Sequence, residues 1–108
     1  MDFTTVLCDQ FHLQPWQVNN VIQLLDEGNT IPFIARYRKE AHGTLDDQVI
    51  RELSERLDYL RNLQKRKEEV GEAIAAQEAM TGELQAALDA AATLAEVEDI
   101  YRPYRPKR

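Results

Sequence analysis

The chain has 108 residues, of which 44% are hydrophobic and 30% are charged, enough for one soluble domain with a modest core. Its formal net charge of −6 argues against a surface that binds nucleic acid over its whole extent. The single cysteine, Cys8, excludes an intramolecular disulfide and a multi-cysteine zinc site. No leader is recognisable, and no segment approaches the about 20 apolar residues that span a bilayer. We therefore expect a cytoplasmic protein with no membrane partner.

Charged residues are segregated along the chain. Residues 1–35 contain no Lys or Arg, and residues 68–101 contain nine acidic residues and no basic one. Apart from Arg51 and Arg56, the basic residues form three groups: Arg36, Arg38 and Lys39; Arg61, Lys65, Arg66 and Lys67; and Arg102, Arg105, Lys107 and Arg108.

Apolar residues recur at helical spacing from Phe3 to Phe11. This helix should end before Pro15, because proline lacks the amide hydrogen that an interior turn requires. Pro15 can open a second helix with an apolar stripe from Val18 to Leu25, and Gly28 can adopt the left-handed conformation that commonly closes a helix. The two predicted helices form a hairpin. It is not expected to read DNA, since its second helix carries no Lys or Arg.

A short helix is predicted over residues 32–37, with proline in its first turn. The side chains expected to face inward are Phe33, Ile34 and Tyr37. Those expected to remain outside are Arg36 and Arg38. His42, next to Gly43, is interpreted as a turn residue rather than a catalytic base.

Thr44, followed by Asp47, resembles the N-terminal cap of a long amphipathic helix. Its apolar positions run from Val49 to Ile74. Gly71 inside it costs about 1 kcal/mol relative to alanine, too little to end a helix held by tertiary packing.

Two shorter helices follow, capped by Thr81 and by Thr93, the latter in a capping box with Glu96. The last helix should stop near Tyr101, because two prolines leave residues 102–108 extended. The predicted fold is therefore all-α: an N-terminal helical hairpin, a long amphipathic helix and two shorter helices. One helical domain covers residues 1–101, and residues 102–108 form an extended basic linker to further domains.

Candidate catalytic groups are few. Cys8 and His12 have i, i+4 spacing and can share a helix face, which suits a thiolate with its base or a pair of metal ligands. Two ligands are too few for a metal site. The adjacent carboxylates of Asp46 and Asp47 would point in different directions on a helix and form no acid/base dyad. We expect no catalytic residue, no metal and no cofactor.

The basic groups carry a nucleic-acid hypothesis, because cations next to tyrosines suit phosphate contact and base stacking. The candidate binding residues are Arg36, Arg38, Lys39, Arg102, Arg105, Lys107 and Arg108. A structural role is the alternative, since arginines beside tyrosines often fix helix packing and a basic, proline-containing stretch is often a plain linker. The group from Arg61 to Lys67 is interpreted as a solvated helix face.

Residues 30–47, TIPFIARYRKEAHGTLDD, form a stretch that neither helix nor strand periodicity would generate. With residues 98–108, EDIYRPYRPKR, this stretch resembles the N-terminal region of the Tex family of bacterial transcription accessory proteins, which are much longer. The resemblance implies an all-helical N-terminal region followed by an RNase H-like domain, helix-hairpin-helix elements and an OB-type RNA-binding domain. His42 and Thr44 stand where the family pattern usually has Thr and Gly, and no functional residue of the family can be matched.

We therefore expect a non-enzymatic N-terminal module of a Tex-like protein that binds RNA through its other domains. Its long helix and exposed flanks would dock against the rest of the parent chain. The expected partners are those remaining domains, RNA or DNA through the parent protein, and the transcription machinery. One alternative is a module that binds nucleic acid directly through its own basic groups. Another is an enzyme centred on Cys8 and His12.

Overall fold

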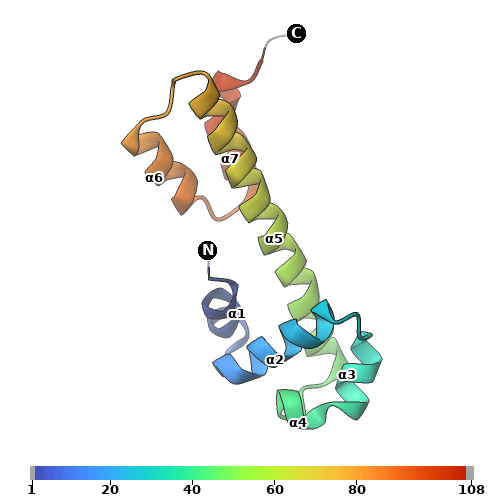
Figure 1. Ribbon diagram of the computed structural model, residues 1–108. Coiled ribbons are helices and arrows are strands. Elements are labelled where there is room, and N and C mark those ends of the chain that lie inside the picture. Colours follow the sequence, from blue (N-terminus) through green and yellow to red (C-terminus); the bar gives the residue numbers. More distant parts are fainter. Residues whose placement is uncertain (1, 107–108) are drawn as a thin grey trace. The chain divides into compact units, whose positions relative to one another are not determined.

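A computed structural model describes residues 2–106, and every regular element in this range is helical (Figure 1). The elements are α1 (Phe3–Phe11), α2 (Pro15–Asp26), α3 (Ile31–Tyr37), α4 (Lys39–His42), α5 (Asp47–Ala76), α6 (Gly82–Ala90), α7 (Leu94–Tyr101) and a 3-10 turn over Arg102–Tyr104. The predicted all-α fold is confirmed, and α4 is the one α-helix that the sequence did not predict. None of the helices in residues 2–106 has the length and apolar character needed to cross a membrane.

The chain divides after Leu60 into two compact units, unit 1 and unit 2, where the sequence predicted a single compact unit with a tail. Leu60 lies inside α5, so this helix contributes to both units. Because α5 buries apolar residues along its whole length, each half of the helix contributes to the core of one unit. One helical domain over residues 1–101 stays a prediction.

In unit 1, α1 and α2 begin as their sequences predict. Asp2 caps α1 by accepting from the backbone N–H groups of Thr4 and Thr5. Pro15 occupies the first turn of α2, where a missing amide hydrogen costs nothing. Gly28, with φ of +92°, follows the end of α2. The hydroxyl of Thr4 donates to the side-chain carbonyl of Asn19 at 2.6 Å, which joins the two helices of the predicted hairpin.

The turn between α4 and α5 differs from the predicted cap. Thr44 has φ of +65°, and its hydroxyl donates to the Gly43 carbonyl rather than capping a helix. Asp46 caps α5 instead, because its carboxylate accepts from the Val49 N–H at 3.0 Å. The prediction at Thr44 is wrong because α4 ends in the left-handed residue Gly43 and the turn continues through Thr44, so the chain reaches its cap two residues later.

His42 is fully buried and links three parts of unit 1. Its Nε2 lies 2.9 Å from the Ile34 carbonyl, and its Nδ1 accepts from the Leu45 N–H at 2.8 Å. These partners fit the neutral tautomer that carries its proton on Nε2. The Gln17 amide donates to the His42 carbonyl at 2.9 Å, so α2 also satisfies the end of α4. His42 is thus a buried structural residue as well as a turn residue.

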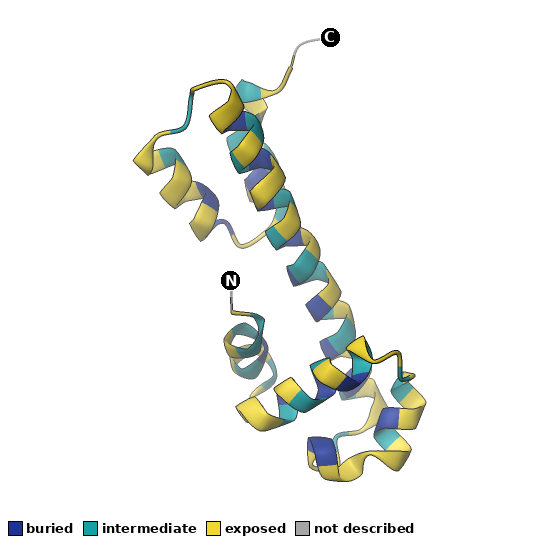
Figure 2. Ribbon diagram, in the orientation of Figure 1, coloured by how far each residue is buried: buried dark blue, intermediate teal, exposed yellow. Residues whose placement is uncertain are grey.

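Each unit has its own apolar core (Figure 2). The core of unit 1 consists of Leu7, Val18, Val21, Leu24, Ile34, Ala41, Ile50, Leu53, Leu57 and Leu60. The core of unit 2 consists of Leu63, Val70, Ile74, Leu88, Ala91 and Val97. The residues from α5 in these lists are spaced three, four or seven apart, which places them on one face of the helix. The predicted amphipathic stripe from Val49 to Ile74 accordingly forms the part of α5 that is buried in the two units.

The short helices of unit 2 begin at the predicted caps. Thr81 accepts from the Leu84 N–H at 3.1 Å, and Thr93 accepts from the Glu96 N–H at 3.1 Å. The carboxylate of Glu96 accepts in turn from the Ala92 N–H. The chain leaves α7 at Tyr101, as predicted, but residues 102–104 form a 3-10 turn and are not extended. Proline allows this conformation, because its φ lies within the range of the 3-10 helix.

Candidate interaction surfaces

One of the candidate nucleic-acid-binding residues of unit 1, Arg38, has an acidic partner. Its Nε donates to Glu40 Oε1 at 2.7 Å, and this hydrogen bond lowers the pKa of the Glu40 carboxyl below its ordinary value. Both side chains are exposed, so the pair adds little to stability. It does offset the charge that Arg38 would offer to a phosphate.

The other two cations of this group, Arg36 and Lys39, line an open groove of about 470 Å³. The remaining residues of the groove are Pro32, Ala35, Thr44, Leu45, Asp46 and Asp47. The two carboxylates stand at the start of α5, where they complement the partial positive charge of the helix N-terminus. A phosphate entering the groove would meet carboxylates as well as cations. This lining of mixed sign disfavours a polyanion.

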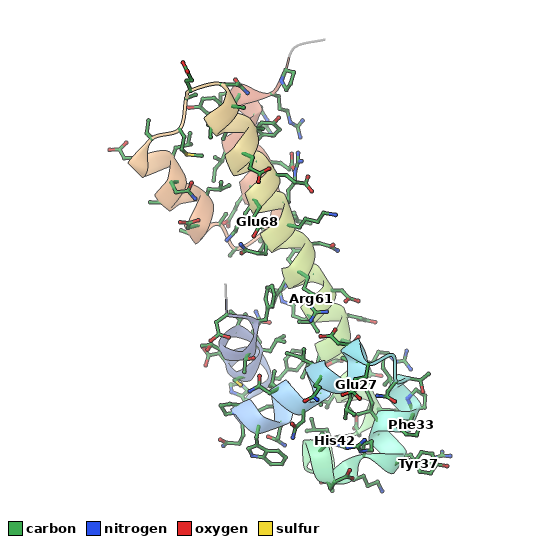
Figure 3. The ribbon with its side chains drawn as sticks, viewed as in Figure 1. Glu27, Phe33, Tyr37, His42, Arg61 and Glu68 are labelled. Carbon is green, nitrogen blue, oxygen red and sulfur yellow. The ribbon has the colours of Figure 1, made fainter. Side chains whose placement is uncertain are left out.

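Two aromatic side chains of α3 are exposed, contrary to the prediction that they pack inward. Phe33 is 40% exposed and Tyr37 is 64% exposed. Their ring centroids lie 5.5 Å apart, and Figure 3 shows both side chains projecting from α3. The prediction is wrong because α3 has only seven residues and reaches the core through Ile34, which is about 100° around the helix from Phe33. The i, i+4 spacing that pairs the two rings was visible in the sequence.

The second candidate group lies in unit 2, and the two residues of it that the structure describes are both engaged. Arg102 Nη2 donates to Asp99 Oδ1 at 2.8 Å, and Arg105 Nη2 donates to the Glu98 carboxylate. The Gln77 amide also donates to the Tyr104 carbonyl at 2.7 Å. Lys107 and Arg108 lie outside the described residues. The segment that was predicted to be an extended linker is therefore held as far as Arg105 by α7 and by Gln77, the residue after α5. Its role as a linker stays a prediction.

Arg66 organises this end of unit 2. Its Nε donates to Glu98 Oε1 at 2.5 Å and its Nη2 to Glu98 Oε2 at 3.2 Å. Its guanidinium also lies 5.4 Å from the centroid of the Tyr101 ring, and Arg105 lies 5.9 Å from the same ring. The bonds from Arg66, followed by that from Arg105, lower the pKa of Glu98 to about 2. These contacts hold α7 and the chain after it against α5.

The interpretation of residues 61–67 as a solvated helix face is wrong for Lys67, as it is for Arg66. Its side chain is buried, and its Nζ donates to the Asp89 carbonyl at 2.9 Å. Asp89 belongs to the last turn of α6, where carbonyl groups without helical partners carry a partial negative charge. The ammonium group therefore caps α6. The sequence places Lys67 one turn after Leu63, on the apolar face of α5, but it does not reveal the partner of the ammonium group.

Cys8 and His12 do not form an activated pair. Burial raises the pKa of the Cys8 thiol, and the nearby carboxylates of Asp9 and Asp2 raise it further. A thiol with a raised pKa is a poor nucleophile at neutral pH. His12 ends α1 in a left-handed conformation, with φ of 56°, so it does not continue the helical face of Cys8. Within residues 2–106 no group of three or more His, Cys, Asp or Glu side chains is placed to hold a metal ion.

Comparison with known proteins supplies the family context. Residues 1–75 match the family model described as the Tex-like protein N-terminal domain. The transcriptional accessory protein Tex of Neisseria gonorrhoeae is 47% identical over 108 residues, which are 100% of this chain and 14% of that protein. The protein tex of Bordetella pertussis is 51% identical over 92 residues, which are 85% of this chain and 12% of that protein.

The similarity extends beyond bacteria. The human S1 RNA-binding domain-containing protein 1 is 35% identical over 104 residues, which are 96% of this chain and 10% of that protein. The chain spans 14% of the length of the first curated relatives that it matches. The similarity to each of them therefore concerns one short region of a much longer protein.

Proposed function

The chain belongs to the Tex family, as a Tex-like N-terminal domain of transcription accessory proteins, and from this premise we propose that it is a non-catalytic module of a longer protein. That parent protein binds RNA through its other domains and acts with the transcription machinery in the cytoplasm. The observation that carries the proposal is the match of 98% to 100% of this chain to 14% of the length of its first bacterial relatives. A relative with an S1 RNA-binding domain in its name supports RNA as the ligand of the parent.

The geometry of the basic groups supports a role without direct nucleic-acid binding. Arg38 is paired with Glu40, and Arg102 and Arg105 are paired with Asp99 and Glu98. Phosphate binding by these side chains would first have to displace carboxylates that already satisfy them. The raised pKa of the Cys8 thiol supports the non-catalytic assignment, since an enzyme built on Cys8 would need a thiolate.

The proposal is tested by titrating the 108-residue chain with single-stranded RNA and with duplex DNA at low and at moderate salt. We expect no binding by the chain at moderate salt, and equal RNA binding by the parent protein with and without residues 1–108. The informative variant is Arg36→Ala with Lys39→Ala, because these two cations line the groove. Arg51→Ala with Lys65→Ala removes the same charge from exposed positions of α5 and serves as the matched control.

Salt-dependent binding that the first variant loses and the control keeps would overturn the proposal in favour of a module that binds nucleic acid itself. An enzymatic role would require a turnover that Cys8→Ala abolishes.

A further inference from the structure

We propose that the aromatic face of α3, formed by Phe33, Arg36 and Tyr37, is the surface through which this module docks onto another part of its parent chain. Phe33 lies at the centre of this face, with Arg36 about 60° to one side of it and Tyr37 about 40° to the other, at 100° per residue. Both rings are exposed and lie in contact range of each other (Figure 3). The inference rests on the proposed function and names the surface that the module would use for it.

The composition of the aromatic face is that of a protein interface. Aromatic residues and arginine are enriched at the buried centres of such interfaces, where each ring removes a large apolar area from water. The buried residue that α3 contributes to the core of unit 1 is Ile34. The two rings are therefore not needed for the core of unit 1 and remain available to a partner.

The cations beside the rings indicate the chemistry of that partner. The side chains of Arg36 and Lys39 have no hydrogen-bond or ion-pair partner within residues 2–106, whereas that of Arg38 is paired with Glu40. An unpaired guanidinium next to exposed rings fits a carboxylate that is presented beside apolar side chains. The fitting partner is a protein segment with an apolar surface and an acidic edge. A polyanion such as RNA fits less well, because Asp46 and Asp47 line the adjoining groove.

The length of the relatives points to the parent chain as the source of this segment. The chain corresponds to 14% of the length of the first bacterial relatives, so most of the proposed parent protein lies outside residues 1–108. A tethered segment is present at an effective concentration in the millimolar range. Docking within one protein therefore needs a far smaller surface than binding between separate proteins, and two rings with one salt bridge suffice.

Hydroxyl-radical footprinting read by mass spectrometry tests the inference. It compares the oxidation rates of Phe33 and Tyr37 in the full-length parent protein and in the 108-residue chain. We expect both residues to be oxidised several-fold more slowly in the parent. Trp16 is 48% exposed in the same unit and serves as the internal control, with equal rates in both proteins. Equal rates for Phe33 and Tyr37 would overturn the inference.

A second arm uses the parent with Arg36→Glu, which reverses the charge on the aromatic face without touching the core. The protection of Phe33 and Tyr37 should fall, whereas the control Arg51→Glu on α5 should preserve it. Protection that survives Arg36→Glu would contradict an acidic partner segment.

Other occupants give different results. Protection that rises with the concentration of the 108-residue chain would show a second copy on the face, and protection that appears only with RNA would show a nucleic-acid site. Either result would overturn the inference. RNA binding by the parent, measured on the same samples, reports separately on the proposed function.

Discussion

The carboxylate of Glu98 accepts two hydrogen bonds from the guanidinium of Arg66, from Nε at 2.5 Å and from Nη2 at 3.2 Å. The two residues are 32 positions apart in the chain, and their side chains are 30% and 32% exposed. This two-point geometry is the strongest form of pairing between arginine and a carboxylate. Because Arg105 donates to the same carboxylate, Glu98 also fixes the chain beyond α7.

Glu98→Gln should lower the free energy of unfolding by about 1 to 2 kcal/mol at pH 7, allowing for solvent screening of the partly exposed pair. The folded-state pKa of Glu98 is lowered from 4.5 to about 2, so its stabilisation is fully present above pH 4.5 and is lost as the pH falls through 2. The difference between wild type and variant should therefore shrink below pH 4.5. Urea denaturation followed by circular dichroism at pH 7, 4 and 3 measures it, and a difference that stays constant would contradict this role.

Local signals in the sequence predicted most of the fold. Pro15, Thr81 and Thr93 mark helix starts because their effect depends on residues within one turn. The apolar period of α5 likewise needs no tertiary information. The predicted cap at Thr44 failed because which of several polar residues caps a helix depends on how the preceding turn closes.

The candidate sites were less predictable, because charge and aromatic content do not reveal partners that are distant in sequence. Arg66 finds Glu98 across the fold of unit 2, and Lys67 finds the end of α6. Both belonged to a group that was interpreted as solvated. The exposure of Tyr37 depends on which side of α3 packs on the core of unit 1, and the sequence of so short a helix does not define that side. The resemblance to a known family was independent of these details and was confirmed.

His42→Ala should destabilise the chain by about 2 to 4 kcal/mol, because it opens a cavity and removes partners of the Ile34 carbonyl and the Leu45 N–H. Thermal and chemical denaturation would measure the loss. His12→Asn is the matched control, since His12 is exposed and left-handed, a conformation that asparagine tolerates. We expect a change within about 0.5 kcal/mol for this control. Comparable losses in both variants would refute the structural role of the buried ring.

The two glycines Gly43 and Gly71 should respond to alanine with opposite signs. Gly43 has φ of +68°, and an added Cβ would lie 2.9 Å from Gln17 Nε2 and 3.1 Å from Trp16 Cη2, so Gly43→Ala should cost about 1 to 3 kcal/mol. At Gly71 the Cβ would lie 3.5 Å from Leu88 Cδ2, an ordinary contact. Gly71→Ala should therefore stabilise α5 by about 0.5 to 1 kcal/mol. Differential scanning calorimetry of both variants checks the signs, and destabilisation by Gly71→Ala would show that α6 packs more tightly than this distance implies.

Local opening of the segment that follows α7 should be measurable as a rate of proteolytic cleavage. Chymotrypsin cleaves after tyrosine, and cleavage after Tyr104 requires the local opening of a segment that Gln77 and Glu98 hold. Glu98→Gln weakens the bond to Arg105 and should speed this cleavage several-fold, with the fragments identified by mass spectrometry. Asp99→Asn provides the control, because the pair of Asp99 with Arg102 is 65% and 74% exposed and contributes little. If both variants are cleaved at the wild-type rate, Glu98 does not hold the segment, and the chain leaves α7 as the flexible linker that its sequence predicts.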